Sequence, residues 1–135
     1  MKKNLNLVLT LGAIAAFTLS LLAFTVPQEK WDVPAEYKNM ENEYAGEDED
    51  DIGKDLYSKH CKSCHGKEGY GDGTKAAELE TSMRDLSTEE VQEQTDGALF
   101  YKSMIGRDEM PNFEKKIRED EDRWMVINYI RTLAE

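Results

Sequence analysis

The chain has 135 residues and a formal net charge of −11, which suits one small domain with flanking segments. This charge argues against binding to nucleic acid, because phosphate backbones are bound by basic surfaces. It also argues against electrostatic adsorption to an anionic membrane surface. A basic docking face on a partner protein remains compatible with it.

The first element along the chain is a hydrophobic segment. Lys2-Lys3 precedes an apolar run that extends from residue 5 to residue 26, the pattern of an export signal. About 20 helical residues cross a bilayer core, and the plausible cleavage signature, Ala23-Phe24-Thr25, is a poor one. The sequence therefore favours an uncleaved membrane anchor at residues 1–26 over a removed signal peptide. In both cases the rest of the chain is expected in the periplasm or at another extracytoplasmic membrane face.

Residues 27–50 form a predicted linker. The stretch ENEYAGEDEDD, residues 41–51, contains seven acidic residues among eleven. A run of like charges this dense repels itself and is typical of a flexible, solvated chain. We therefore predict a spacer that holds a folded domain, residues 51–135, away from the membrane. A docking tail for a basic partner is the alternative interpretation.

The folded part predicts an all-α protein. The pattern DIGKDLYSKHC suits a helix of about three turns that starts near Asp51, and Ser87-Thr88-Glu89-Glu90 resembles a capping box that starts a helix near Thr88. Further helices are expected from Asp96 to Gly106 and from 119–120 onward. The last of these carries an apolar stripe at helical spacing: Trp124, Ile127, Ile130 and Leu133. No segment alternates with period two over a useful length, so no sheet beyond a trivial pairing is expected.

Both cysteines and both histidines of the chain lie between His60 and His65. The run Cys61-Lys62-Ser63-Cys64-His65 is the C-x-x-C-H pattern of c-type haem attachment. Two thiols three positions apart on one helical turn can bond to the two vinyl groups of one porphyrin, and the next residue can place its imidazole under the iron. We expect Cys61 and Cys64 to attach one haem c and His65 to be the proximal iron ligand. The glycines of GKEGYGDG then let the backbone pass close to the haem edge.

Other chemistries use the same residue types. A zinc site needs four ligands, and Cys61, Cys64, His65 and His60 cannot readily surround one ion from a single helical turn. A thioredoxin-like redox pair needs a βαβ context, which the pattern does not predict. A chance match in an ordinary exported domain is the third alternative. Haem attachment is favoured over all three.

A sixth iron ligand must come from the opposite side of the ring. His60 directly precedes Cys61, is tied to the proximal side and cannot reach that face. A thioether remains, from Met104 or Met110. Met104 sits in a predicted helix, where a methionine is usually core, whereas Pro111 pushes Met110 toward an extended conformation in a rigid loop. The sequence favours Met110 as the distal iron ligand.

Several motifs together resemble the class I cytochrome c family over about residues 51–135: CKSCHG, the GYGDG loop, Met110-Pro111 and the aromatic last helix. In that family a glycine and an aromatic residue of the first helix cross an aliphatic and an aromatic residue of the last. The matching residues here are Gly53 and Tyr57, then Val126 and Tyr129. Many relatives place a proline soon after the C-x-x-C-H, and its region supplies a carbonyl to the histidine Nδ1–H. This chain has glycines there instead, which leaves that carbonyl unassigned.

A haem held by His65 and Met110 has no free coordination site, which favours single-electron transfer over enzymatic catalysis. We expect this transfer at the outer face of a membrane, between respiratory-chain components. The expected partners are redox proteins such as a quinol-oxidising complex or a terminal oxidase, with membrane contact through residues 5–26 if they are uncleaved. The alternative is a haem-based gas sensor or small haem enzyme in which Met110 detaches.

Overall fold

The computed structural model describes residues 30–48 and 50–134. The predicted hydrophobic segment, residues 5–26, lies outside these residues. Across the ranges that are described, no helix is long and apolar enough to cross a bilayer. A compact unit runs from Asp32 to Glu135 and contains all the predicted site residues.

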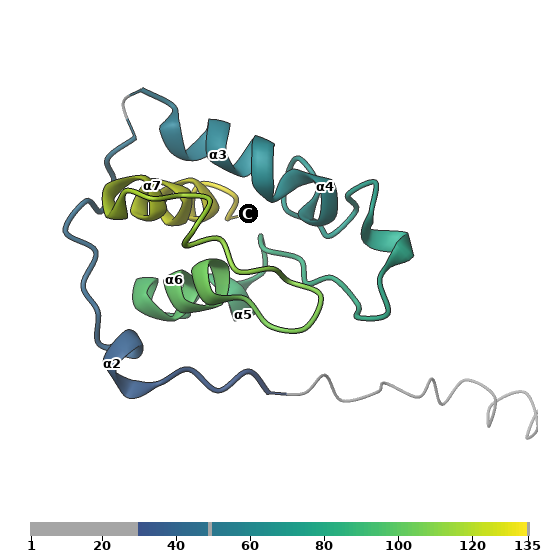
Figure 1. Cartoon of the computed structure of the whole chain (residues 1–135), viewed down its shortest axis with the longest axis horizontal. Helices are drawn as coiled ribbons and strands as arrows, with labels where there is room; N and C mark the ends of the chain where they lie inside the picture. Colours follow the sequence, from purple (N-terminus) through teal and green to yellow (C-terminus); the bar gives the residue numbers. More distant parts are fainter. Residues whose placement is uncertain (1–29, 49, 135) are drawn as a thin grey trace, which may run out of the picture. The chain divides into compact units, whose positions relative to one another are not determined.

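This unit is built from helices (Figure 1). In chain order they are α2 (Ala35–Lys38), α3 (Ile52–His60), α4 (Lys62–His65), the 3-10 turn η1 (Ala76–Glu78), α5 (Glu89–Gln92), α6 (Asp96–Ile105) and α7 (Asp120–Arg131). The described residues contain no strand, and their extended pairing is a single bridge between Arg107 and Met110. The all-α prediction is confirmed.

Helices α3 and α7 pack against each other (Figure 1). A Cβ atom on Gly53 would lie 2.0 Å from the Met125 carbonyl oxygen, so a glycine is required for this approach. The Tyr57 and Tyr129 rings have centroids 5.0 Å apart. The Tyr57 hydroxyl donates to the Gly66 carbonyl at 2.9 Å, which ties the crossing to the chain just after CKSCH.

Helix α6 begins and ends where the sequence predicts. Thr95 is its N-cap, with Oγ1 accepting from the Ala98 N–H at 3.2 Å, and Gly106 follows its last residue with φ of 73°. Helix α7 begins at Asp120, also as predicted. The buried core lies mainly on these two helices and the chain between them: Leu99, Phe100, Met104, Phe113, Ile117, Trp124, Val126, Ile127 and Ile130.

The predicted capping box at residues 87–90 is wrong, although a helix does begin after Thr88. Helix α5 has four residues, and its N-cap Thr88 makes no side-chain cap. The Thr88 hydroxyl donates instead to the Asp85 carbonyl at 2.9 Å, and the Ser87 hydroxyl donates to the Asp85 carboxylate at 2.7 Å. Asp85 competes for the hydroxyls that would have capped the helix.

The prediction of a flexible linker does not describe residues 32–48, which we call the strap. Val33 is buried, and α2 packs on α6 with the Tyr37 and Tyr101 ring centroids 4.7 Å apart. The acidic side chains of the strap are exposed except that of Asp48, which is partly buried and accepts from the Gly53 N–H at 2.9 Å. The strap is held by residues that are buried or partly buried against the helices: Val33, Tyr37, Met40, Asn42 and Tyr44. Charge density alone therefore did not reveal that this segment is folded.

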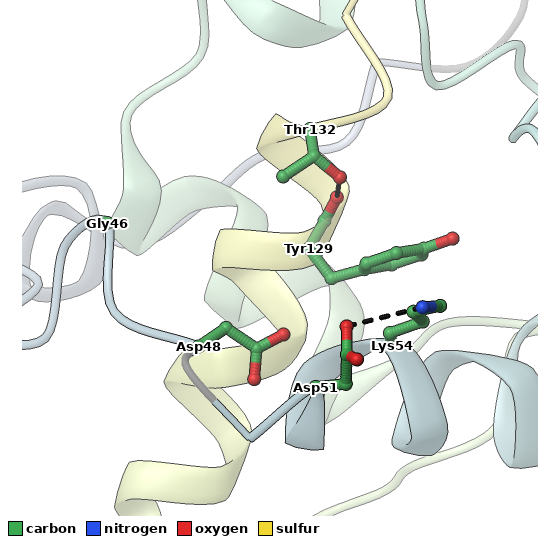
Figure 2. Close-up of a pocket in the computed structure, with 6 residues that line it drawn as sticks. All are labelled: Gly46, Asp48, Asp51, Lys54, Tyr129 and Thr132. Atoms are coloured by element: carbon green, nitrogen blue, oxygen red, sulfur yellow. Dashed lines mark hydrogen bonds and ion pairs between the residues drawn. The ribbon is translucent and has the colours of Figure 1, made fainter.

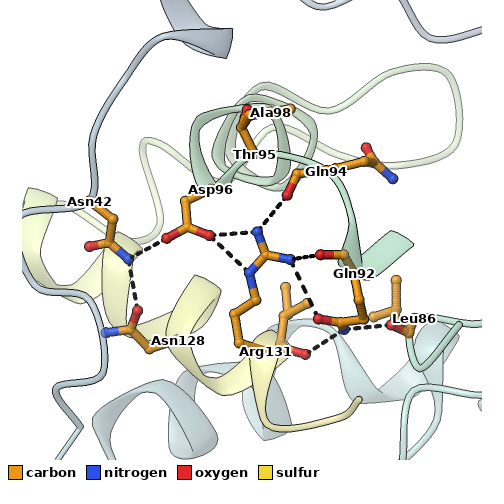
Figure 3. Close-up of polar contacts among 10 residues, drawn as sticks. Asn42, Leu86, Gln92, Gln94, Thr95, Asp96, Ala98, Asn128 and Arg131 are labelled. Atoms are coloured by element: carbon orange, nitrogen blue, oxygen red, sulfur yellow. Dashed lines mark hydrogen bonds and ion pairs between the residues drawn. The ribbon is translucent and has the colours of Figure 1, made fainter. Parts of the chain in front are cut away.

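A polar network fastens the strap to α7 and to the start of α6 (Figure 3). The buried Asn128 amide donates to the Tyr44 and Glu47 carbonyls at 2.6 and 2.7 Å, and its oxygen accepts from Asn42 at 2.8 Å. Next to it, the Arg131 guanidinium donates to Asp96 at 2.6 and 2.8 Å. It also donates to the carbonyls of Gln92 and Gln94, each at 2.6 Å.

A hollow of about 380 Å³ lies where the end of the strap meets α3 and α7 (Figure 2). Its lining residues are Gly46, Asp48, Asp51, Lys54, Tyr129 and Thr132. It is open to solvent, with Lys54 paired to Asp51 at 3.3 Å across an exposed edge. None of the predicted site residues lines it.

Candidate functional site

The structure places the C-x-x-C-H residues on one helical turn, as predicted. The carbonyl of Cys61 accepts from the N–H groups of Cys64 and His65 at 3.1 and 2.9 Å. Helix α4 then ends at Gly66. The two cysteines are partly buried and are not joined by a disulfide, so both thiols are present on the same turn as the His65 imidazole.

Burial sets the protonation of these groups. It raises the pKa of the Cys61 thiol to about 12, with a smaller contribution from Cys64, and it lowers the pKa of the His65 imidazole to about 4. His65 is therefore neutral at pH 7, the state in which imidazole binds a metal. Its Nδ1 is buried and has no hydrogen-bond partner among the described residues, so the structure does not assign a carbonyl to it.

The glycine-rich segment after His65 folds back over this turn. The N–H groups of Gly71, Gly73 and Lys75 donate to the carbonyls of residues 65, 64 and 63 at 2.9, 3.1 and 2.8 Å. A Cβ atom on Gly73 would lie 2.5 Å from two of these carbonyl oxygens. The glycines thus bring the backbone close to the CKSCH turn, and these hydrogen bonds fix the orientation of that turn. The approach of the glycines to the haem edge stays a prediction.

The two candidate methionines have different environments. Met104 is 1% exposed and belongs to the hydrophobic core. Met110 is half-buried on the loop after α6, where its backbone N–H and C=O are both paired with Arg107 at 2.9 Å. The Phe113 N–H then returns to the Met104 carbonyl at 2.8 Å. The loop that presents Met110 is therefore held at both ends.

His60 and Glu109 have contacts that sequence reasoning missed. The His60 ring lies 5.7 Å from the Phe113 ring, and its Nε2 is buried without a hydrogen-bond partner among the described residues. The Glu109 carboxylate accepts from the Glu80 and Thr81 N–H groups at 3.1 and 2.8 Å. Nothing in the local sequence around Glu109 signals a partner nearly thirty positions away.

The residues on the CKSCH turn fit a covalently attached haem. Two thiols stand on one turn outside any disulfide, beside an imidazole that burial keeps neutral and therefore able to bind a metal. Together with the crossed first and last helices, this turn defines a class I c-type cytochrome.

Comparison with known proteins gives the same class and a family. The chain belongs to the family described as "Cytochrome C oxidase, cbb3-type, subunit III", whose model matches residues 48–130. It is similar to the solved structure of KustC0563 c-type cytochrome, with 26% identity and a TM-score of 0.52. That match covers 62% of this chain and 98% of the other. No curated protein shows a significant match.

The cofactor is therefore a covalently bound haem c with its iron, and the function of the domain is electron transfer. The family indicates an electron carrier, with redox partners in respiratory oxidase complexes. Cytochrome c domains of this kind typically work outside the cytoplasm.

Proposed function

We propose that this protein is a single-electron carrier at the outer face of a membrane, with haem attached through Cys61 and Cys64. His65 and Met110 would be the proximal and distal iron ligands. When bound, haem supplies reversible one-electron chemistry between ferrous and ferric iron. We further propose that residues 1–26 anchor the chain and that residues 51–135 form the cytochrome c domain.

The observation that carries the ligand assignment is the contrast between Met104 and Met110. Met104 fills the core between α6 and its neighbours, and a thioether committed to that packing is not free to bind iron. Met110 stands on a loop whose backbone is fixed by its bridge to Arg107 and by the Phe113–Met104 hydrogen bond. A fixed loop supports a ligand because little ordering entropy is lost when the side chain binds.

The CKSCH turn contributes position and protonation state. The hydrogen bonds to the Cys61 carbonyl hold Cys64 and His65 on the same turn, and the loop of residues 71–75 holds that turn in place. Burial keeps the His65 imidazole neutral at pH 7, so no proton has to leave before it binds iron. With two protein ligands, the iron has no open coordination position, which suits electron transfer rather than binding of a substrate.

The partners follow from the family description and remain part of this proposal. A family described by a subunit of a cbb3-type oxidase supports exchange of electrons with a terminal oxidase or with a quinol-oxidising complex that feeds it. Attachment to the membrane through residues 5–26 would keep the domain close to such partners.

The test is carbon monoxide binding to the reduced, haem-loaded protein, followed by its visible spectrum. The wild-type protein is expected not to bind carbon monoxide, because both axial positions of the iron are filled. Met110→Ala should bind it readily. Met83→Leu is the matched control, since Met83 is also a half-buried loop methionine and should behave as wild type.

Two results would overturn the proposal. If the wild-type protein binds carbon monoxide readily, the iron has an open position, and a gas sensor or haem enzyme becomes the better interpretation. If Met83→Leu opens the iron and Met110→Ala does not, the electron carrier stands but its distal ligand is another methionine.

A further inference from the structure

The loop that carries Met110 is attached to two separate parts of the molecule. Its bridge between Arg107 and Met110 and its bond from Phe113 to Met104 tie the loop to itself and to α6. Glu109 makes a different attachment. Its two carboxylate oxygens accept from the backbone N–H groups of Glu80 and Thr81, one oxygen to each, at 3.1 and 2.8 Å.

The segment that Glu109 reaches is joined to the CKSCH side of the site. Residues 80 and 81 follow η1, which contacts α4. Further on, Met83 lies against Gly71, where a Cβ atom would approach the Met83 Cβ to 2.9 Å, and the Leu86 N–H donates to the Gly69 carbonyl at 2.8 Å. Glu109 therefore links the loop of the proposed distal ligand to the segment of chain that follows the proposed proximal ligand.

The geometry of this link is that of a two-point clip. A carboxylate that accepts two adjacent backbone N–H groups restrains both the distance and the orientation of the segments it joins. The neighbouring Asp108 is turned to a different partner, Arg107, at 3.2 Å.

We propose that Glu109 is a positioning residue for the distal ligand, acting by clipping the Met110 loop to residues 80–81. This inference rests on the proposed function, in which Met110 binds the iron. The clip opposes movement of the Met110 loop away from residues 80–81, and such a movement is one way for the Met110 thioether to leave the iron. Loss of the clip raises the fraction of molecules in which the loop has moved, so an external ligand competes more successfully for the iron.

The test is the affinity of the oxidised, haem-loaded protein for imidazole, which displaces a methionine ligand. Glu109→Ala is expected to bind imidazole about threefold to tenfold more tightly than wild type. Glu109→Gln, which keeps one acceptor oxygen, should fall between the two. The far-red methionine-to-iron(III) charge-transfer band is the second readout, and in Glu109→Ala it should fade at a lower temperature. Circular dichroism of each variant checks that the helices are intact.

Asp108→Asn is the matched control, because it removes the same charge one residue away and leaves the clip in place. Asp108 has φ of 53°, a left-handed conformation that asparagine tolerates well. Its imidazole affinity should stay within about twofold of wild type. If Asp108→Asn and Glu109→Ala change affinity equally, the effect is one of charge and the clip is not a positioning device.

Met110→Ala separates failure of the clip from failure of the proposed function. If Met110→Ala binds imidazole no better than wild type, the ligand assignment is wrong. If Met110→Ala opens the iron while Glu109→Ala and Glu109→Gln match wild type in both readouts, the ligand stands and the clip is refuted.

Discussion

The network around Arg131 and the CKSCH turn differ in how fully the chain satisfies its own polar groups. Around Arg131, every guanidinium nitrogen donates to an acceptor (Figure 3). The Asn128 amide is bonded at both its nitrogen and its oxygen. At the CKSCH end, two imidazole nitrogens, His60 Nε2 and His65 Nδ1, are buried without a hydrogen-bond partner in the part of the chain that the structure describes. Buried polar groups in native proteins are nearly always bonded. The strap end thus satisfies its polar groups within the chain, whereas the CKSCH end does not, and we expect the packing of the CKSCH end to depend on the attached haem.

The largest effect that tests this difference is removal of haem attachment. In the Cys61→Ser, Cys64→Ser double variant we expect loss of covalent haem and amide exchange accelerated about a hundredfold or more over residues 60–73. The strap and the N-terminal half of α6 should keep most of their protection, because their hydrogen bonds do not involve the cofactor. Exchange measured by mass spectrometry, with haem retained after acid extraction, reports both results.

Lys62→Ala is the control for that experiment, since Lys62 lies on the same turn and its exposed side chain takes no part in attachment. If residues 60–73 of the double variant exchange as slowly as in the loaded protein, the CKSCH end is stable without its cofactor. The contrast between the two regions would then be false.

The second effect is smaller and lies at the strap end. Arg131→Met removes the donor of the Gln92 and Gln94 carbonyls and leaves Asp96 with Asn42 as its remaining side-chain donor. It should reduce the free energy of unfolding by about 1–3 kcal/mol, a range discounted because the pair is partly exposed to solvent. The visible spectrum of the loaded protein should not change. Guanidinium denaturation followed by circular dichroism measures the loss.

The exposed Arg118 supplies the comparison, as Arg118→Met removes the same charge without touching the network. A shift of the haem spectrum in Arg131→Met would mean that the two ends are coupled. An unfolding curve equal to that of Arg118→Met would mean that the network contributes no stability of its own.

Local sequence signals predict those parts of this molecule whose contacts are near in sequence. Helix α6 is marked by its start at Asp96 and its end at Gly106, α7 by its apolar stripe, and the CKSCH turn by its spacing. These features follow from bonds within one or two helical turns, so composition and spacing contain the information.

The strap and Glu109 were not predicted, because their partners are far away in the sequence. Asn42 bonds to Asn128, 86 positions later, and Glu109 reaches back 28 and 29 positions. In the strap, the acidic residues dominate the composition, while Val33, Tyr37 and Tyr44 provide the anchoring. A reading of the apolar and amide residues at three- to five-residue spacing, rather than of net charge, would have found that segment.

The smallest effect concerns His60 at the cofactor end. Burial, then the nearby Lys59 and Lys116, lower its pKa below 6.5 in the folded protein. Between that folded pKa and 6.5 the unfolded chain binds the proton more readily, so His60 favours folding above pH 6.5 and this contribution is lost as pH falls.

His60→Phe keeps an aromatic contact with Phe113 and removes the titration. The His60→Phe variant should therefore lose less stability than the wild-type protein between pH 7.5 and pH 5. This difference should be smaller than the loss of stability caused by Arg131→Met. Denaturation midpoints of the two loaded proteins across this range measure the difference. Parallel curves would show that folding does not shift the pKa of His60. Among the described residues, Nδ1 of His65 would then be the unsatisfied nitrogen that distinguishes the CKSCH end.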